Sequence, residues 1–583
     1  MRSCLLVTIF MLLNLFLNSV PRASAQDYRL PDLVNYYSSI YGNFIVPDEE
    51  KSSSISDVTF QLNQLGSFAP IGIHKFDLQY TQGLFRFDVM RFKQFMNADD
   101  LLDAKVSFYS KLRFDEFHQR HEAPYRYLAG WMTLNHPPVK KAELNIGEYY
   151  RRFSPKLPRP SNSVFFDSDF QKKIDHNTAT ELTFENHPKA LFNGDSIKEK
   201  VRLVKAAKKF ILAAVMAYSC DSSSEELTQA LIDKAADGIP VTLMMERFYM
   251  GIPFARCTHR LRRAGIDVVL VSDKWKPRSF LSFFHDKFWV RDAEEVIVGG
   301  QNIIKYENDS TGWNGMNRDT DLLLSGPIAT DFSIQYIDLW KDYRGRRNRI
   351  LEPLRNDFEA MKTNQRALGI RGESAYHSRL NDSNQRMNGA CRALVQRPGV
   401  THSLIADTLQ SHFEVATHSI LLSSPELSFT RENRFFASIQ KAVQKNNIKA
   451  ELILNGVDGG NGEFTIAMRE AMIRAYQYGK NLKFRLWKKI YGFEPRKTAS
   501  KHRTNLLEVM RNTGMRAWTH FNYMHAKQAY IDRTVTAISS MNLDRASMER
   551  NHEAGAICMD EQLSVQIENQ LALDLANSVP VTE

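Results

Sequence analysis

A short motif that occurs twice constrains this chain more than any other feature of its sequence. Residues 283–292 read FFHDKFWVRD, and residues 523–532 read YMHAKQAYID. In both copies a lysine stands two positions after a histidine, and an aspartate stands five positions after the lysine. Six further residues lead to a four-residue turn, which ends at Asn302 in one copy and at Asn542 in the other. Two copies with equal internal spacing indicate a duplicated unit.

The histidine–lysine spacing has a direct physical meaning if the motif forms a β-strand. Side chains two positions apart point to the same face of a strand, so His285 lies beside Lys287 and His525 beside Lys527. An imidazole acts as a nucleophile or as a general acid near neutral pH. An ammonium group stabilises negative charge that develops on oxygen. Two such pairs in one site suit displacement at a phosphodiester.

The first 25 of the 583 residues have the features of a signal peptide. Arg2 precedes a mainly apolar run at 5–17, and an Ala-Ser-Ala sequence ends at Ala25, where we expect cleavage. The run is shorter than the roughly 20 residues that a membrane span needs, although an uncleaved anchor is the alternative. The mature protein is therefore expected to be exported, either periplasmic or secreted, or peripheral to a membrane.

Charge narrows the class of partner without choosing one. The formal net charge is +10, and loss of the two arginines in the signal peptide leaves +8. A basic protein favours anionic partners such as phospholipid headgroups, nucleic acid or acidic glycans.

Four cysteines remain after the signal peptide, and none forms a C-x-x-C pair, which argues against a zinc site. One or two disulfides and free buried thiols are both open for Cys220, Cys257, Cys391 and Cys558.

The rest of the chain predicts an α/β fold with two duplicated halves, each a mixed sheet flanked by helices. We assign residues 26–185 to an accessory N-terminal region, 186–345 to the first half, 346–398 to a connector with a helix near 354–368, and 399–583 to the second half. The expected strands are 210–216, 241–245, 266–271, 419–423, 450–454 and 482–487, and the expected helices of the second half are 405–416, 433–444 and 464–478.

Two local features of these regions have specific interpretations. A turn before the first helix of the first half places its N-cap at Asp195 or Ser196. In the accessory region, His118, His121 and Glu122 share a helix face, which we interpret as a solvated surface because the context of a metal site is missing.

The paired motifs resemble those of the phospholipase D superfamily. The resemblance covers roughly residues 190–575, and the second copy continues as NLDRAS at 542–547 and Asn-His-Glu at 551–553, similar to bacterial cardiolipin synthases. It implies two α/β halves packed as a pseudo-dimer with both motifs in one cleft. No obligate oligomer is expected, because one chain carries both motifs.

The resemblance also implies roles for the motif residues. One histidine attacks phosphorus to form a phosphohistidine, and the other protonates the leaving alkoxide. By resemblance to enzymes with two motifs in one chain, His285 is the nucleophile and His525 the acid, although the sequence itself does not distinguish them. The groups expected to hold the non-bridging oxygens are Lys287, Lys527, Asn302 and Asn542. No metal or cofactor is expected, since the lysines supply the positive charge.

Each imidazole also needs an acceptor for its other nitrogen. We expect Glu553 to serve His525 and Asp319 to serve His285, with Asp321 as an alternative to Asp319. The motif aspartates, Asp292 and Asp532, stand at an odd spacing from the lysines, which turns them away from the lysine face and predicts that they anchor the strand end. In the first turn Gly300 lacks the hydroxyl that Ser540 supplies in the second, which is expected to alter a phosphate contact.

The substrate is less constrained. Basic and aromatic residues precede both motifs, at 274–284 and 488–501. This composition suits a phospholipid membrane surface, and it also suits single-stranded nucleic acid. A lipid phosphodiesterase or phosphatidyltransferase is favoured because small nucleases of the family carry one motif. A nuclease or a non-catalytic lipid-binding module is the alternative, and hydrolysis versus transfer stays open.

Overall fold

The computed structural model describes residues 163–580 except 248–251, 272–282, 309–316, 345–350, 398–402, 426–433, 455–505, 521–522 and 577. The expected signal peptide, the His118 cluster and nearly all of the accessory region lie outside the described residues. So do the predicted helix at 464–478, the predicted strand at 482–487, and most of the basic and aromatic segments before the two motifs. No helix in the described part of the chain is long and apolar enough to cross a membrane.

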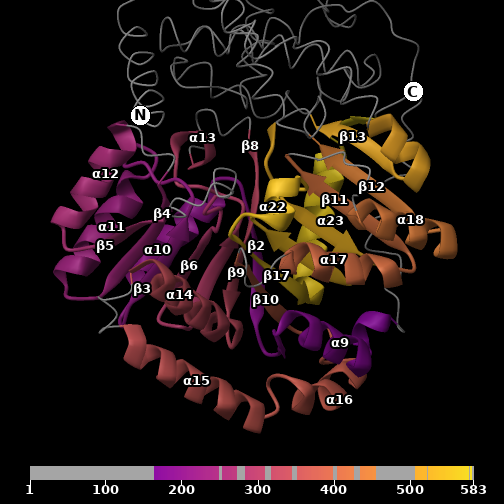
Figure 1. Cartoon of the computed structure of the whole chain (residues 1–583), viewed down its shortest axis with the longest axis horizontal. Coiled ribbons are helices and arrows are strands. Elements are labelled where there is room, and N and C mark those ends of the chain that lie inside the picture. Colours follow the sequence, from indigo (N-terminus) through magenta and orange to yellow (C-terminus); the bar gives the residue numbers. More distant parts are fainter. Residues whose placement is uncertain are drawn as a thin grey trace, which may run out of the picture. The chain divides into compact units, whose positions relative to one another are not determined.

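The first half is a mixed sheet of seven strands in the order β2-β9-β7-β6-β3-β4-β5 (Figure 1). Strands β3, β4 and β5 run parallel, and the other neighbours in the sheet are antiparallel. The parallel strands are apolar along most of their length, because helices cover both faces of such a sheet. The strands are β2 (His187–Phe192), β3 (Ile211–Val215), β4 (Val241–Glu246), β5 (Asp267–Val271), β6 (Phe288–Arg291), β7 (Glu295–Gly299) and β9 (Thr320–Ser325). The helices are α10 (Asp195–Ala206), α11 (Glu225–Ala236), α12 (Ile252–Arg263), α13 (Lys305–Asn308) and α14 (Ile328–Arg344).

The second half repeats this topology in a sheet of nine strands, ordered β1-β10-β17-β16-β15-β11-β12-β13-β18. Its parallel strands β11, β12 and β13 correspond to β3, β4 and β5, and β15, β16 and β17 correspond to β6, β7 and β9. The predicted α/β fold with two duplicated halves is confirmed. The strands are β1 (Leu182–Thr183), β10 (Ala390–Gln396), β11 (Ser419–Ser424), β12 (Lys449–Leu454), β13 (Arg516–His520), β15 (Gln528–Ile531), β16 (Val535–Ser539), β17 (Glu553–Met559) and β18 (Ser578–Pro580). The helices are α17 (Leu404–Val415), α18 (Arg434–Asn446), α22 (Arg545–Glu549) and α23 (Glu561–Ala576).

The second half extends beyond its predicted boundary at residue 399. Strand β1 pairs with β10 at its edge, and α9 (Ser168–Thr178) packs against α17. Residues 163–183, which include the short helix η2 (Val164–Phe166), therefore belong to the second half and not to an accessory region. Strand β10 lies inside the predicted connector, whose described residues also form the helices α15 (Leu351–Ala367) and α16 (Glu373–Asn381). These assignments were wrong because strand partners far apart in the chain leave no local signal.

Two smaller predictions also need correction. The N-cap of α10 is Gly194, which makes no side-chain cap. The Ser196 hydroxyl contacts Asp321 instead, at 2.5 Å. In the second half the strand beside β12 is β13, for which the sequence analysis predicted no strand.

Asp292 and Asp532 anchor the ends of the motif strands, as the spacing predicts. The Asp292 carboxylate accepts hydrogen bonds from three consecutive backbone N–H groups, those of residues 208–210, at 2.8 to 2.9 Å. Asp532 accepts from the N–H groups of residues 417–419 at 2.7 to 2.8 Å. Both aspartates adopt a positive φ, 55° and 49°, a conformation that aspartate tolerates better than most residues. Each carboxylate is therefore fully used in joining its motif strand to the start of the neighbouring strand.

The four cysteines of the described residues form two disulfides, Cys220–Cys257 and Cys391–Cys558. The alternative of free buried thiols is therefore wrong. Cys391–Cys558 joins β10 to β17 across the second sheet, where the two residues are directly opposite.

A buried ion pair distinguishes the first half from the second. The Lys200 ammonium lies 2.9 Å from the Asp321 carboxylate, and each side chain is only 2% exposed. Helices α10 and α17 are equivalent and end at the C-caps Ala207 and Ala416. Lys200 lies seven residues before the first C-cap, and its counterpart seven residues before the second is Leu409. The counterpart of Asp321 is Gly555, because Asp321 stands two residues after Asp319 and Gly555 two residues after Glu553.

This ion pair predicts a large single-site effect and a partial rescue. Lys200→Leu is expected to lower the free energy of unfolding by about 3–5 kcal/mol, because it leaves a buried carboxylate without its cation. The double variant Lys200→Leu/Asp321→Gly copies the second half and should recover part of that loss. Urea unfolding of the two variants measures the difference. Equal midpoints for wild type and Lys200→Leu would contradict the prediction.

Candidate active site

The two motifs meet because each is hydrogen-bonded to the other half of the chain. Strand β14 (Tyr523–Met524), which enters the second motif, pairs in parallel with β8 (Asn317–Arg318) of the first half. The backbone N–H of His525 then donates to the Arg318 carbonyl at 2.8 Å. On the other side, the N–H of His285 donates to the His552 carbonyl at 3.0 Å. The strands therefore cross between the halves, as expected for a pseudo-dimer.

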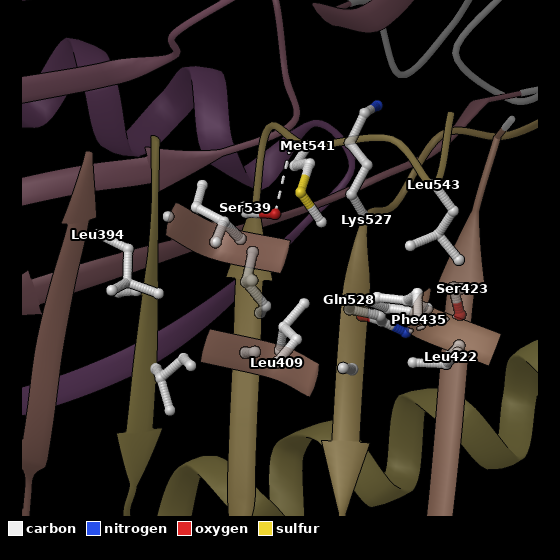
Figure 2. Close-up of a pocket in the computed structure, with 17 residues that line it drawn as sticks. Leu394, Leu409, Leu422, Ser423, Phe435, Lys527, Gln528, Ser539, Met541 and Leu543 are labelled. Atoms are coloured by element: carbon white, nitrogen blue, oxygen red, sulfur yellow. Dashed lines mark hydrogen bonds between the residues drawn. The ribbon is translucent and has the colours of Figure 1, made fainter. Parts of the chain in front are cut away.

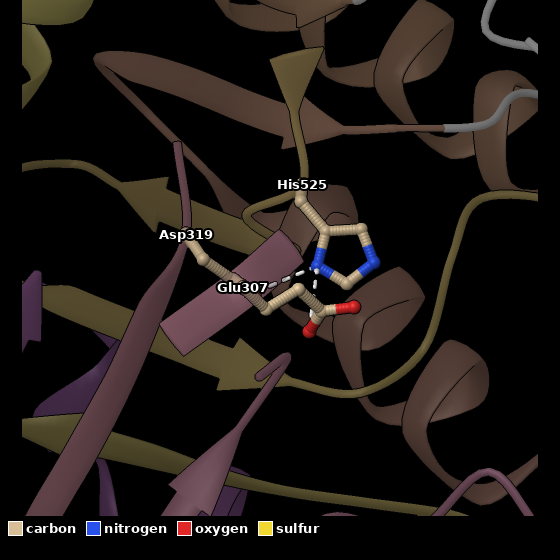
Figure 3. Close-up of side chains that lie close together, drawn as sticks. All are labelled: Glu307, Asp319 and His525. Carbon is tan, nitrogen blue, oxygen red and sulfur yellow. Dashed lines mark hydrogen bonds and ion pairs between the residues drawn. The ribbon is translucent and has the colours of Figure 1, made fainter. Parts of the chain in front are cut away.

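The crossing decides which carboxylate serves which histidine. Nδ1 of His285 lies 2.8 Å from Glu553, and Nδ1 of His525 lies 2.6 Å from Asp319 (Figure 3). The predicted pairing, Glu553 with His525 and Asp319 with His285, is wrong. Asp319 directly follows Arg318, whose carbonyl binds the backbone of His525, and Glu553 directly follows His552. Each carboxylate therefore reaches the histidine of the other half. Asp321 contacts Lys200 and is not an orienting carboxylate.

Ser540 and Gly300 have different roles from those expected. The Ser540 hydroxyl donates to the Glu553 carboxylate and so helps to hold it. At Gly300 a Cβ atom would lie 2.5 Å from the Asp319 carboxylate, closer than real Cβ contacts allow. The glycine therefore provides space for the shorter acidic side chain, and the serine supports the longer one.

The site is buried and its charges are strongly coupled. Burial lowers the pKa of His285, and the nearby Glu553 opposes that effect. Although burial disfavours the charged form of Asp319, His525 holds the pKa of Asp319 at about 2. Burial likewise opposes ionisation of Glu553, but His285 lowers the pKa of that carboxyl. Both carboxylates are therefore ionised, so each Nδ1–H is a donor and each Nε2 is the nitrogen available for chemistry.

The two motif lysines adopt equivalent conformations. Lys287 Nζ donates to the His285 carbonyl at 2.9 Å, and Lys527 Nζ donates to the His525 carbonyl at 2.5 Å. Burial lowers the pKa of Lys287 to about 8, although Glu553 raises it. Lys287 is thus mainly protonated at neutral pH and supplies positive charge to the site.

Comparison with known proteins supports the fold and the pairing of motifs. The family model described as cardiolipin synthase, PLD-like domain, matches residues 201–336 and 409–575, which together make up more than half of the chain. This chain belongs to the phospholipase D superfamily. The resemblance seen in the two motifs is thereby confirmed.

Curated relatives of this phospholipase D family member include cardiolipin synthases. Cardiolipin synthase A of Pseudomonas fluorescens (strain Pf-5) is 21% identical over 401 residues, covering 67% of this chain and 69% of that protein. Cardiolipin synthase A of Pseudomonas aeruginosa (strain PAO1) is 20% identical over 413 residues, covering 70% of each. Among solved structures, the phosphatidylserine synthase of Haemophilus influenzae Rd KW20 matches with a TM-score of 0.47 and 14% identity, covering 70% of this chain and 91% of that one. That structural match is too distant to bear on activity.

The two motif asparagines of this phospholipase D family member are not equivalent. Asn302 Oδ1 accepts from the Ala217 N–H at 3.2 Å, and its Nδ2 donates to Glu307 at 3.0 Å. Asn542 Oδ1 is buried without a hydrogen-bond partner among the described residues. Glu307 was missed by the sequence analysis because the second copy has Ser547 at the same distance from its asparagine. An acidic residue five positions after Asn302 was the available signal.

Glu307, Asp319 and His525 are close enough to be compared with a metal site (Figure 3). Their potential ligand atoms lie within 4.8 Å of one another. The nitrogen that His525 offers is Nδ1, which already donates to Asp319. The arrangement therefore fits a histidine ring held between two carboxylates better than it fits a metal ion.

A small cavity in the second half is lined mainly by apolar side chains, and the motif lysine Lys527 is also among its lining residues. It lies between the sheet and α17, with Leu409, Met541 and Leu543 among its lining side chains, and it has a volume of about 20 Å³ (Figure 2). That volume accommodates about one water molecule. The Lys527 side chain extends away from the apolar side chains that line the cavity, and the cavity is too small to hold a phospholipid.

The crossed pairing predicts an effect on pH dependence. Neutral His285 is needed for attack, and Glu553 is the group that raises its pKa. Glu553→Gln should therefore shift the acidic limb of the kcat/KM profile to lower pH. It should also reduce kcat/KM at pH 7 by about 10²-fold, because the imidazole loses the acceptor that orients it.

Asp319→Asn is the matched control, since it removes the carboxylate that serves the other histidine. Its acidic limb should stay in place while its rate falls. A shift of the acidic limb in Asp319→Asn, with none in Glu553→Gln, would support the uncrossed pairing instead.

Proposed function

We propose that this protein is an exported phosphatidyltransferase of the phospholipase D type, with cardiolipin-synthase-like activity on phospholipids. The observation that carries the proposal is the pair of crossed histidine–carboxylate contacts beside Lys287 and Lys527. Two imidazoles with oriented Nδ1–H groups supply one nucleophile and one acid. Two lysines supply positive charge for a phosphodiester. The family model and the names of the curated relatives support a phospholipid as the substrate.

The proposed reaction has two displacements at phosphorus. In the first, His285 Nε2 attacks, the bond from phosphorus to the leaving alcohol oxygen breaks, and His525 gives its Nε2 proton to that oxygen. In the second, an acceptor alcohol gives its proton to His525 and attacks phosphorus, and the phosphorus–nitrogen bond breaks. His285 and His525 return to their starting states. Charge on the non-bridging oxygens is neutralised by the lysines.

The nucleophile is assigned to His285 on its electrostatic setting. Burial lowers its pKa, so the imidazole is neutral at neutral pH and its Nε2 carries a lone pair. Glu553 accepts from Nδ1 and stabilises the positive charge that forms when Nε2 bonds to phosphorus. Covalent attack by His285 through Nε2 is therefore consistent with the contact of Nδ1 with Glu553.

Export is supported by two independent features. Residues 1–25 have the composition of a signal peptide. The two disulfides, Cys220–Cys257 and Cys391–Cys558, suit an oxidising compartment such as the periplasm or the extracellular medium. The net charge of the mature chain suits an anionic membrane surface.

Turnover of defined lipids tests the proposed function. The full mature chain is incubated with phosphatidylglycerol vesicles, and the products are separated by mass. Transfer gives cardiolipin and glycerol, whereas hydrolysis gives phosphatidic acid and glycerol. Activity should persist in EDTA, since no step requires a metal.

The other outcomes decide between the alternatives. Degradation of DNA or RNA without lipid turnover would identify a nuclease. Vesicle binding without any phosphodiester cleavage would identify a binding module.

A further inference from the structure

A second carboxylate faces His525, in addition to Asp319. Glu307 lies on α13, its side chain is 7% exposed, and its Oε2 is 3.8 Å from His525 Nδ1. The same carboxylate accepts from the backbone N–H of Asn302 at 2.5 Å and from its Nδ2 at 3.0 Å. Glu307 therefore joins the asparagine of the first motif to the histidine of the second.

Among the described residues, the environment of His285 has no group that matches Glu307. The residue of the second half that corresponds to Glu307 is Ser547, five positions after Asn542. The neighbouring Asp286 is fully buried, burial raises its pKa well above the usual range, and neither of its carboxyl oxygens has a hydrogen-bond partner among the described residues. Among the described residues, Glu553 is the carboxylate within hydrogen-bonding distance of the His285 ring. The two histidines, equivalent in sequence, differ in nearby negative charge.

Glu307 is held by a chain of buried contacts that only the first half can make. Gln301 Nε2 donates to the Glu307 backbone carbonyl at 2.6 Å, and Gln301 Oε1 accepts from Lys200 at 3.1 Å. The Gln301 backbone N–H donates to Asp321 at 3.1 Å. The corresponding residues of the second half are Met541, Leu409 and Gly555, none of which has a polar side chain. The Lys200–Asp321 ion pair thus supports the turn that carries Asn302 and Glu307.

We propose that Glu307 is a positioning residue for His525, a second carboxylate that favours the protonated imidazole and so makes His525 the general acid. The inference rests on the proposed two-histidine reaction and adds the element that makes its two halves unequal. The other charged groups of this cluster among the described residues are Asp319 directly before β9, Lys527 two residues after His525, and Lys287 of the first motif. Among them, Glu307 and Asp319 favour the imidazolium, and the two lysines oppose it.

Proton NMR-detected titration of the histidine rings tests this directly and does not depend on activity. The full chain is labelled with ¹³C-histidine, and the His525 signal is identified by its loss in His525→Asn. In Glu307→Gln the midpoint of the His525 titration should fall by about one pH unit, a tenfold weaker hold on the proton. Glu307→Asp, which keeps the charge, should shift it less.

Two further variants keep the test decisive. Glu568→Gln is the matched control, because Glu568 is also buried but bonds Tyr530 and Arg533 away from the motif histidines. It should leave the His525 midpoint unchanged. If Glu307→Gln does not fold, Gln301→Met copies the second half and should shift the midpoint in the same direction. An unchanged His525 midpoint in a folded Glu307→Gln, or in a folded Gln301→Met when Glu307→Gln is unfolded, would overturn the proposal.

Kinetics separates this inference from the proposed function. Lys287 also lies near Glu307, so a shifted pH–rate profile alone does not identify the group. Glu307→Gln should slow cleavage of an alkyl phosphodiester about tenfold, yet barely slow release of p-nitrophenolate, which leaves without protonation. Equal loss on both leaving groups would count against the proposal. Absence of phospholipid turnover by wild type would refute the proposed function, while the ring titration would still decide the role of Glu307.

Discussion

His285→Asn is expected to reduce phospholipid turnover by about 10⁴-fold or more, the scale found when the nucleophile of a covalent mechanism is removed. Asparagine can still donate to Glu553, so the carboxylate keeps a partner. It has no basic nitrogen to attack phosphorus, so the covalent intermediate does not form. Turnover of phosphatidylglycerol measures the loss. Wild-type enzyme incubated with ³²P-labelled lipid and denatured in SDS at neutral pH should carry label, because the phosphorus–nitrogen bond is labile only in acid, and His285→Asn treated in the same way should carry none.

His412→Asn provides the matched control for this loss. His412 is also buried, 3% exposed, but it lies on α17, where its Nδ1 contacts the Thr408 carbonyl at 2.8 Å. Its replacement should lower stability and leave the turnover of the folded enzyme close to wild type. Turnover by His285→Asn within tenfold of wild type would rule out His285 as the nucleophile.

His525→Asn is expected to give the second largest effect, with a different signature. Loss of the acid should slow cleavage of an alkyl phosphodiester by about 10²–10⁴-fold. The first step with a p-nitrophenyl phosphodiester should survive, because that leaving group needs no proton. The second step then lacks its base, so a burst of about one p-nitrophenolate per enzyme should precede a slow phase, and labelled phosphohistidine should accumulate.

The two histidine variants together distinguish the two roles. A burst and a trapped intermediate in His285→Asn, with neither in His525→Asn, would reverse the assignment. Loss of the burst in both variants would indicate that each histidine is needed before the first bond breaks.

Much of the local structure was predictable because its causes lie close together in the chain. The apolar runs predicted strands such as β3 and β12, and the helix expected near 354–368 appears as α15. The strand-end role of Asp292 and Asp532 followed from the odd spacing to the motif lysines, since side chains alternate along a strand. Errors arose where the partner was distant. β10 was assigned to the connector because its partner β17 is more than 150 residues away.

In the candidate site, too, the sequence predicted some features and left others undecided. The sequence by itself determined the chemical groups, because two equally spaced copies of one motif require two histidines, two lysines and two asparagines. It also identified Asp319 and Glu553 as the acidic residues beyond each motif. It could not decide which carboxylate serves which histidine, since either pairing is compatible with the spacing.

Only the tertiary structure made that decision. The strand before each histidine hydrogen-bonds to the other half, at Arg318 and at His552, and the next residue along is the carboxylate. The inequality of the two histidines has the same origin. Glu307 reaches His525 from a turn of the first half, and such a contact depends on how two separately folded halves pack, which no spacing within one copy records.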